Sequence, residues 1–185
     1  MNSSVLCELL LCAASVWAAA DSLKNGHGWR VAGFALITFT ALLGALVYGG
    51  LETARPAHQT MTGISGRISL LLIAIGSLHG APRHLLLAAL AALMLWLPNN
   101  LALAGNLLAL IAIAWPGRSQ RWPLAIAGAL LFVLAGLGIA GRGDWWGIPR
   151  VDLYHLTLTL ATLCWTLARL RGTRWLLGTP ASLAR

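Results

Sequence analysis

Apolar segments of nearly membrane-spanning length follow one another along the whole chain, separated by short breaks that contain Gly, Pro, Asn or charged residues. A helix of about 20 apolar residues crosses a hydrocarbon core of roughly 30 Å. The pattern therefore predicts an all-α fold, a single integral membrane bundle of seven transmembrane helices over residues 1–185. In chain order the predicted helices lie near residues 5–20, 31–51, 68–80, 85–97, 101–115, 123–140 and 151–168.

The first segment ends in a stretch that also occurs in secretory signals, because Ala18-Ala19-Ala20 precedes Asp21 as an A-x-A cleavage site would. A signal peptide normally carries positive charge ahead of its apolar run. Here no Lys or Arg precedes the run, and Glu8 lies within it. We therefore expect this segment to be the first transmembrane helix.

Pro98-Asn99-Asn100 interrupts the apolar stretch between residues 85 and 115. A single helix over that stretch would be about 46 Å long at 1.5 Å per residue, too long for a simple span. A proline followed by two asparagines is typical of a tight turn. We predict two short helices joined by a hairpin. A re-entrant hairpin is the alternative, because the segments are short for full spans.

Composition supports the membrane interpretation. Of the 185 residues, 58% are hydrophobic and 10% are charged, and the mean hydropathy is +0.77; in soluble domains about 25% are charged. The net charge of +8 does not form a basic patch, because the Lys and Arg residues are scattered between apolar runs, so we expect no nucleic-acid partner. Cys7, Cys12 and Cys164 lie in apolar segments without CxxC spacing and are expected to be small buried side chains.

The basic residues predict the orientation. With seven spans and the N-terminus outside, nine of the 13 Lys and Arg residues lie on the cytoplasmic side and four outside; fusing residues 85–115 into one helix gives eight against five at best. Cytoplasmic loops carry the excess, so we predict a multi-pass protein of the cell inner (plasma) membrane with the N-terminus outside and the C-terminus cytoplasmic. The cytoplasmic set is Lys24, Arg30, Arg83, Arg118, Arg121, Arg169, Arg171, Arg174 and Arg185, and the outer set is Arg55, Arg67, Arg142 and Arg150.

The segments between the spans carry two further features. The longest expected loop, residues 52–67, contains Gly, Ser and Thr and is predicted to lie outside. Tryptophans near the predicted helix ends are expected to anchor the chain at the headgroup level. They are Trp29, Trp115, Trp122, Trp145, Trp146 and Trp175.

The last apolar segment carries an acid and an imidazole together, Asp152 and His155. Three residues apart on a helix, they share one face with their Cβ atoms about 5–6 Å apart. The predicted orientation brings Glu8 and Tyr48 into the same outer leaflet from the first and second helices. Ionisable groups at membrane depth usually face a bundle interior or a wet cavity. We therefore predict a binding site formed by Glu8, Tyr48, Asp152 and His155.

Each of these residues also has a structural interpretation. Asp152 and His155 are expected to share a proton and to act as a general base, a metal ligand or a proton relay; alternatively, they form an interhelical hydrogen-bond pair that specifies packing. Glu8 is either part of the site or an interfacial carboxylate, and Tyr48 either a ligand or a buried ring with a hydrogen-bonded hydroxyl.

Weaker polar positions are interpreted structurally. Asn106, Thr38 and Thr40 lie inside apolar segments and are predicted to make interhelical hydrogen bonds. His79 lies towards the cytoplasmic side, where contact with lipid headgroups is favoured over metal binding.

Asp152-Leu-Tyr-His155 in the last helix and Gly44-Ala-Leu-Val-Tyr48-Gly49 at the end of the second carry a resemblance. The chain resembles a small bacterial family of seven-transmembrane proteins whose last helix opens with an Asn-Asp-Leu-x-His-like motif. That family is distantly similar to the CREST superfamily, which includes the alkaline ceramidases and the adiponectin-receptor-like hydrolases.

The resemblance implies a zinc ion held by one His of the second helix and two of the seventh. His155 matches one of these positions, but Tyr48 stands where the second helix would offer its His, and Val151 and Thr159 flank His155 where its HxxxH partner would be. A phenol is a poor substitute for imidazole, and catalytic zinc usually takes three protein ligands. No cofactor is therefore predicted, with zinc at His155 as the alternative.

Two functions follow from the sequence. The first is a non-catalytic bundle that binds a membrane lipid or another small ligand at the polar cluster. The second is a membrane-embedded hydrolase of lipid amide or ester bonds, with His155 as the base, Asp152 as its orienter and Glu8 as an acid or an additional ligand.

Overall fold

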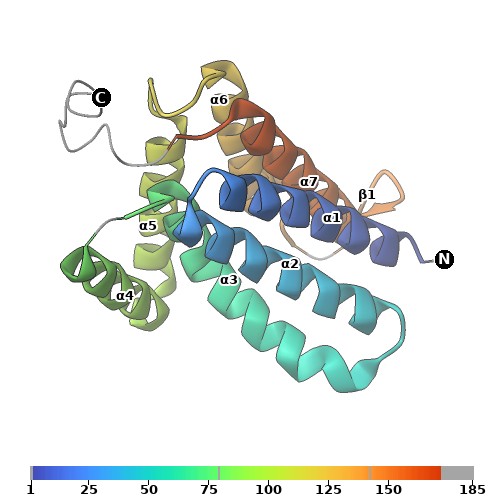
Figure 1. Ribbon diagram of the computed structural model, residues 1–185. Coiled ribbons are helices and arrows are strands. Elements are labelled where there is room, and N and C mark those ends of the chain that lie inside the picture. Colours follow the sequence, from blue (N-terminus) through green and yellow to red (C-terminus); the bar gives the residue numbers. More distant parts are fainter. Residues whose placement is uncertain (1, 79, 142, 172–185) are drawn as a thin grey trace.

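The computed structural model describes residues 2–78, 80–141 and 143–171 and is built mainly of helices (Figure 1). The predicted positions of His79, Arg142, Arg174, Trp175 and Arg185 lie outside the described residues. In chain order the elements are α1 (Ser3–Lys24), α2 (Gly28–Tyr48), the 3-10 turn η1 (Glu52–Ala54), α3 (Arg55–Ile75), α4 (Ala81–Trp96), α5 (Asn99–Ala114), α6 (Trp122–Val133), the π-helical turn η2 (Leu134–Ile139), β1 (Asp144–Trp145), β2 (Ile148–Pro149) and α7 (Arg150–Ala168).

The predicted all-α class is confirmed, and the helices follow the predicted order. Three of the described helices are long and apolar enough to cross a membrane: α1, α2 and the continuous Trp122–Ile139 segment of α6 and η2. The break at Pro98 separates α4 from α5, as the tight-turn prediction required. With 16 residues each, α4 and α5 are about 24 Å long, less than the roughly 30 Å of a hydrocarbon core.

The helices form a bundle in which α1, α2 and α3 pack side by side as antiparallel neighbours. Helix α2 lies between α1 and α3, and α7 packs on the other side of α1 and also against α6 (Figure 1). Helix α5 contacts α3 and α6, and α4 lies at the edge of the bundle. The N-terminal ends of α1, α3 and α7 and the C-terminal end of α2 thus gather at one end of the bundle, where Figure 1 also shows β1.

The prediction of a loop over residues 52–67 is wrong. Apart from the short turn η1, this stretch belongs to α3. Pro56 lies in the first turn of α3. Backbone N–H groups in a first turn have no partner within the helix, so the lack of an N–H in proline costs no hydrogen bond there. Gly63 and Gly66 each disfavour a helix by about 1 kcal/mol relative to alanine, but other residues of α3 pack against α2 and α5. Packing therefore outweighs the loop-like composition.

A short β-hairpin before α7 was also not predicted. Strands β1 and β2 pair antiparallel through Asp144 with Pro149 and Trp145 with Ile148. The two residues of the turn, Trp146 and Gly147, have φ angles of 52° and 79°. Two-residue hairpin loops favour positive φ at both positions, because such a turn matches the twist of the strands.

The core depends on glycines that let helices approach closely. At Gly33 of α2, a Cβ atom would lie 2.8 Å from the backbone oxygen of Ser69 and 2.8 Å from Cγ1 of Ile73. At Gly128 of α6, it would lie 2.5 Å from the indole nitrogen of Trp165, a side chain that is only 1% exposed. The largest buried cluster forms around these contacts. Its members are Ala18, Phe34, Leu70, Ile73, Ala74, Ala109, Leu110, Ile113, Ala129 and Trp165.

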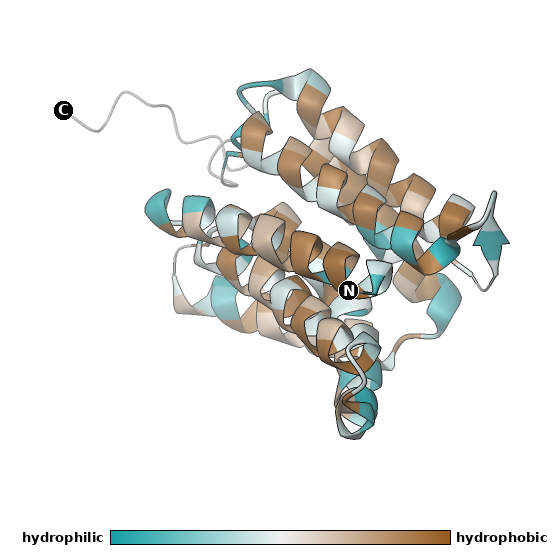
Figure 2. Ribbon diagram, turned by 90° about the vertical axis from the view of Figure 1, so that its right-hand side faces the viewer, coloured by the Kyte–Doolittle hydropathy of each residue, from teal (hydrophilic) through white to brown (hydrophobic). Residues whose placement is uncertain are grey.

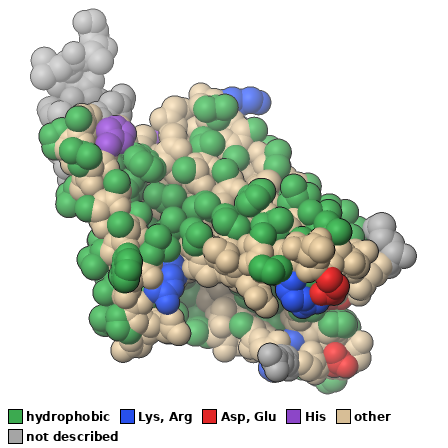
Figure 3. All heavy atoms as spheres, turned by 90° about the horizontal axis from the view of Figure 1, so that it is seen from below, with side chains coloured by type: hydrophobic (Ala, Val, Ile, Leu, Met, Phe, Trp, Pro, Cys, Tyr) green, Lys and Arg blue, Asp and Glu red, His purple; other side chains and the backbone are tan. Residues whose placement is uncertain are grey.

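Much of the outer surface is apolar. Figure 2 shows hydrophobic residues along the length of the helices and hydrophilic residues mainly near their ends. Figure 3 shows hydrophobic side chains distributed across one face, with few charged side chains among them. Leu85 and Leu86 of α4 are 70% and 71% exposed, and Leu108 of α5 and Leu130 of α6 are also largely exposed. In water such a surface would be costly.

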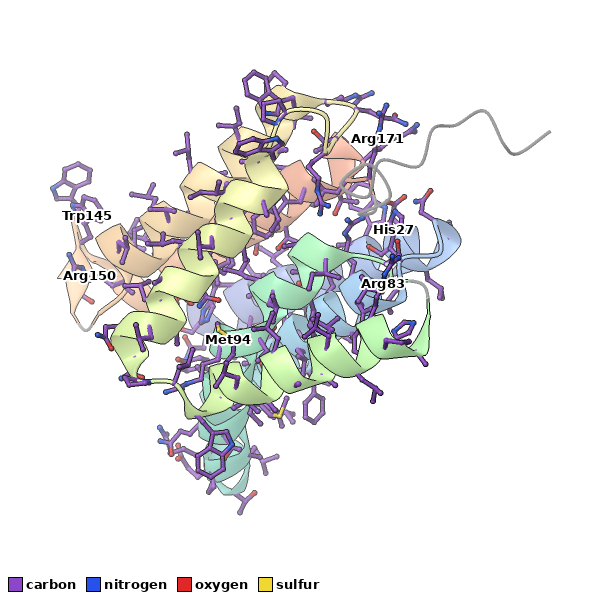
Figure 4. All side chains as sticks on the ribbon, turned by 90° about the vertical axis from the view of Figure 1, so that its left-hand side faces the viewer. His27, Arg83, Met94, Trp145, Arg150 and Arg171 are labelled. Atoms are coloured by element: carbon purple, nitrogen blue, oxygen red, sulfur yellow. The ribbon has the colours of Figure 1, made fainter. Side chains whose placement is uncertain are left out.

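Two buried arginines join the helix ends opposite β1. Arg30 donates from Nε to the Ile73 carbonyl oxygen (3.1 Å) and from Nη1 to the Leu170 carbonyl oxygen (2.7 Å). Arg118 donates from Nη2 to the Ala74 carbonyl oxygen. The carbonyls at a helix C-terminus lack helical partners, so both guanidinium groups satisfy the end of α3. Figure 4 places Arg83 and Arg171 at this same end, and Arg150 and Trp145 at the opposite end.

We predict that Gly33→Ala lowers the stability of the protein by roughly 1–3 kcal/mol, because the added methyl group forces α2 away from the backbone of α3. Gly63→Ala in α3 is the matched control: a Cβ there meets nothing within 4 Å, so the better helix former should be neutral or stabilise by up to about 1 kcal/mol. Thermal unfolding in detergent measures both. A Gly33→Ala protein as stable as the unmodified chain would contradict the close packing of α2 on α3.

Candidate functional site

A cavity of about 260 Å³ lies among α1, α2, α3 and α7, towards the end of the bundle that carries β1. Its walls combine two kinds of side chain, as is usual for ligand sites. The polar wall includes Glu8, Tyr48, His58, Ser65, Ser69 and His155, and the apolar wall includes Leu11, Ile37, Phe132 and Leu158. Three of the four residues of the predicted site, Glu8, Tyr48 and His155, therefore line one cavity.

The central contact of the cavity is between Glu8 of α1 and His155 of α7. Oε1 of Glu8 lies 3.3 Å from Nε2 of His155, and the side chains are 1% and 12% exposed. Oε1 of Glu8 and Nδ1 of His155 are buried and have no hydrogen-bond partner. Buried polar atoms are normally satisfied. The cavity thus presents a carboxylate and an imidazole that still have unused hydrogen-bonding capacity.

Asp152 is placed differently from the prediction. It is buried and accepts a hydrogen bond from the Ser4 hydroxyl of α1, at 2.6 Å between Oγ and Oδ1, and it does not line the cavity. The expected sharing of a proton between Asp152 and His155 is replaced by two contacts across the α1–α7 interface. The reason is helical geometry: Ser4 and Glu8 are four residues apart on α1, and Asp152 and His155 three apart on α7, so each pair occupies adjacent turns on one face.

Gly44 of α2 makes room for the Glu8 carboxylate. A Cβ atom at this position would lie 2.1 Å from Oε1 of Glu8 and 2.6 Å from its carboxyl carbon. No side chain can occupy that position unless the carboxylate moves. The segment Gly44–Tyr48 therefore contributes twice to the cavity, with Gly44 accommodating Glu8 and Tyr48 lining the wall.

Helix α3 contributes a polar wall that the sequence analysis missed, because residues 52–67 were interpreted as a loop. His58, Thr62, Ser65 and Ser69 all line the cavity. Their spacing of four, three and four residues is the repeat of one helix face, and this was the signal that could have identified α3. The imidazole of His58 stands edge-on to the Tyr48 ring, with 6.4 Å between the ring centroids.

The other polar residues of the apolar segments have mixed outcomes. Asn106 donates from Nδ2 to the Gly66 carbonyl oxygen at 2.7 Å, which confirms the predicted interhelical bond between α5 and α3. The Thr40 hydroxyl bonds to the Leu36 carbonyl oxygen of its own helix at 2.8 Å and to the Met61 carbonyl oxygen of α3 at 3.4 Å, so the predicted interhelical bond is present but long. Oγ1 of Thr38 is buried without a hydrogen-bond partner, so the interhelical bond predicted there is not formed.

The zinc site that the resemblance implies is not matched by these donors. Within residues 2–78, 80–141 and 143–171, no three His, Cys, Asp or Glu side chains are placed so that they could hold a metal ion together. Catalytic zinc usually takes three protein ligands, whereas Glu8 and His155 form only a pair. Chemistry at this site is therefore best considered through the side chains themselves.

The Glu8–His155 pair is suited to two roles, general base catalysis and ligand binding. A carboxylate that accepts a hydrogen bond from one ring nitrogen fixes the orientation and tautomer of an imidazole, which is the arrangement of a general base with its orienting group. Oε1 of Glu8 and Nε2 of His155 are 3.3 Å apart but do not form that hydrogen bond in this structure. The same pair can bind a ligand by accepting hydrogen bonds at Oε1 and using the free Nδ1. Both roles use Glu8 in the place that the sequence analysis had given to Asp152.

We predict that Glu8→Gln and His155→Gln are strongly coupled. Each variant should lower the thermal stability in detergent, and the double variant should depart from additivity by roughly 0.5–3 kcal/mol, because both remove the same contact. Ser4→Ala with Asp152→Asn should behave in the same way.

The control cycle combines Asp152→Asn with His155→Gln, whose coupling should be smaller than that of either contact pair. If this control cycle shows the largest coupling, the two residues act on each other directly, as the sequence alone suggested, and the assignment of partners across α1 and α7 is wrong.

Comparison with protein-family models, with curated proteins and with solved structures gives no match to this chain. The similarity to the CREST superfamily accordingly remains a prediction from two short motifs.

Proposed function

We propose that the chain is a multi-pass protein of the bacterial inner membrane, with seven spans, the N-terminus outside and the C-terminus in the cytoplasm. Three long apolar helices and the exposed leucines support a membrane environment. The orientation is supported by Arg83 and Arg171 lying at one end of the bundle and Arg150 at the other, since cytoplasmic ends carry the basic excess. The short helices α4 and α5 fit if the bilayer is locally thinned.

We further propose that the bundle binds a small ligand or a membrane lipid in the cavity lined by Glu8, Tyr48 and His155. The observation that carries this proposal is the unused hydrogen-bonding capacity of Oε1 of Glu8 and Nδ1 of His155 inside a cavity of about 260 Å³. Such atoms are costly in an apolar surrounding, and a ligand with a polar group satisfies them. The apolar wall, with Leu11 and Phe132 among its residues, suits the remainder of a lipid-like molecule.

A hydrolase of lipid amide or ester bonds is the second candidate, and one observation favours it. The 3.3 Å contact between Glu8 and His155 gives an imidazole with an orienting carboxylate. In this role His155 takes a proton from a water molecule as the water attacks the carbonyl carbon, and it returns the proton to the leaving amine or alcohol as the C–N or C–O bond breaks. Asp152, expected from the sequence to orient His155, would instead hold the start of α1 through Ser4.

The topology is tested by reporter fusions in the connections that the structure defines. Fusions after Gly50, Pro98 and Gly143 should report outside, and a fusion at the C-terminus should report inside. The fusion points avoid Arg67, which lies in the middle of α3. An inside signal at Gly143 would contradict the orientation and place the cavity in the other leaflet.

We expect a molecule from a total lipid extract of the host to remain bound to the protein in native mass spectrometry. Glu8→Gln should reduce its occupancy about tenfold or more, because a hydrogen bond to a charged group contributes about 1.5–3 kcal/mol. Glu52→Gln is the matched control: Glu52 is exposed in η1, and its hydrogen bond with Arg55 lowers the pKa of its carboxyl group. Equal occupancy in both variants would contradict binding at Glu8.

The same preparation separates the two candidates. Incubation with a fluorescent N-acyl lipid should leave it intact if the protein only binds, whereas release of fatty acid that His155→Gln abolishes would establish the hydrolase. Metal analysis after purification without chelator should give far less than one zinc per chain. Stoichiometric zinc that is lost in His155→Ala would contradict this expectation and favour the hydrolase.

A further inference from the structure

A second cavity, of about 320 Å³, lies on the other side of α3, between α3, α4 and α5. Its wall is apolar except at one place, where Arg118 from the α5–α6 connection lines it. The volume is within the range of sites that hold small organic ligands. The apolar wall includes Leu71, Leu90, Met94, Leu108 and Ala112.

Arg118 is an unusual residue to find there. Its side chain is only 2% exposed, and in the described part of the chain no carboxylate lies within ion-pair distance of it. Nη2 donates to the Ala74 carbonyl oxygen, but Nε is buried without a hydrogen-bond partner. A guanidinium group has five N–H donors and keeps its charge in proteins. A buried cation with an unused donor is costly unless an anion is bound beside it.

The wall that faces Arg118 across the cavity can adapt. Only Leu87 and Met94 of α4 are buried, and the remaining α4 leucines are largely exposed, so α4 is held by few side chains. Met94 lies against Gly105 of α5, where a Cβ atom would come within 2.8 Å of its sulfur; Figure 4 shows Met94 near the end of α4 opposite Arg83. Methionine side chains adjust readily to different shapes.

We propose that this second cavity binds a free long-chain fatty acid, with the carboxylate at Arg118 and the chain along Leu90, Met94 and Leu108. The charge identifies an anion, and the apolar wall identifies a hydrocarbon chain. The burial of Arg118 selects a compact headgroup, because the guanidinium group is reached through the cavity and a phospholipid headgroup is too bulky to enter it. The site is separate from the Glu8–His155 cavity and does not depend on the function proposed there.

Photo-crosslinking tests the proposal. Palmitate carrying a diazirine in its chain should label peptides of α4 and α5 in the purified full-length protein. Unmodified palmitate should compete for the labelling, and hexadecanol, which has the same chain without the charge, should compete at least about tenfold less well, as expected for the loss of a charged hydrogen bond. A phospholipid with palmitoyl chains should not compete. If the alcohol or the phospholipid competes as well as palmitate, the proposal is wrong.

Two variants and a control locate the site. Arg118→Gln should reduce labelling about tenfold or more, and Ala112→Phe should reduce it by filling the cavity while leaving Arg118 in place. Arg121→Gln removes an exposed arginine three residues away and should leave labelling unchanged. Thermal unfolding confirms that each variant is folded. Undiminished labelling in a folded Ala112→Phe protein, or equal labelling in the Arg118 and Arg121 variants, would overturn the assignment.

Discussion

The burial of the Glu8 carboxylate constrains how α1 packs between α2 and α7. A carboxylate with 1% exposure requires a partner on the neighbouring helix and space for its oxygens. His155 provides the partner from α7, and Gly44 provides the space on α2. The order of packing, α7 on α1 and α1 on α2, follows from these two requirements as much as from the apolar contacts around Leu11 and Leu158.

The fold was largely predictable because the apolar segments are long and their breaks are marked. Pro98 and the prolines in the first turns of α3, α4 and α6 leave few other ways to divide the chain. The prediction of a loop over residues 52–67 was wrong for a specific reason. A helix with a polar face towards a cavity contains as many polar residues as a loop does, so composition alone does not distinguish the two. Only the spacing of His58, Thr62, Ser65 and Ser69 distinguishes the two.

The candidate site was predictable in its location and less so in its contacts. Depth along each helix follows from counting residues, and it correctly brought Glu8, Tyr48 and His155 to one cavity. Which carboxylate meets His155 depends on the rotation of α1 relative to α7. That rotation is set by packing at positions such as Gly44, and no spacing within a single helix reports it. The sequence analysis therefore paired His155 with Asp152, the carboxylate on the same helix.

At the end of the bundle opposite β1, Arg30 and Arg118 bond to backbone carbonyls of α3. The final carbonyls of α3 have no helical partners, and the Arg30 and Arg118 side chains that reach them are only 3% and 2% exposed. Arg30 and Arg118 approach these carbonyls from two different segments of the chain, α2 and the α5–α6 connection. They thereby fix the end of α3 relative to helices that are distant in sequence.

Helix α3 separates the two cavities. His58, Thr62, Ser65 and Ser69 face one of them, while Leu71 and Ala74 face the other, roughly half a turn away around the helix axis. A sideways displacement of α3 that enlarges one cavity narrows the other. Because Arg67 also bonds to the carbonyls that end α4, such a displacement is transmitted to α4 as well. The two cavities therefore share α3 as a common wall, and the volume of each depends on the position of the same helix.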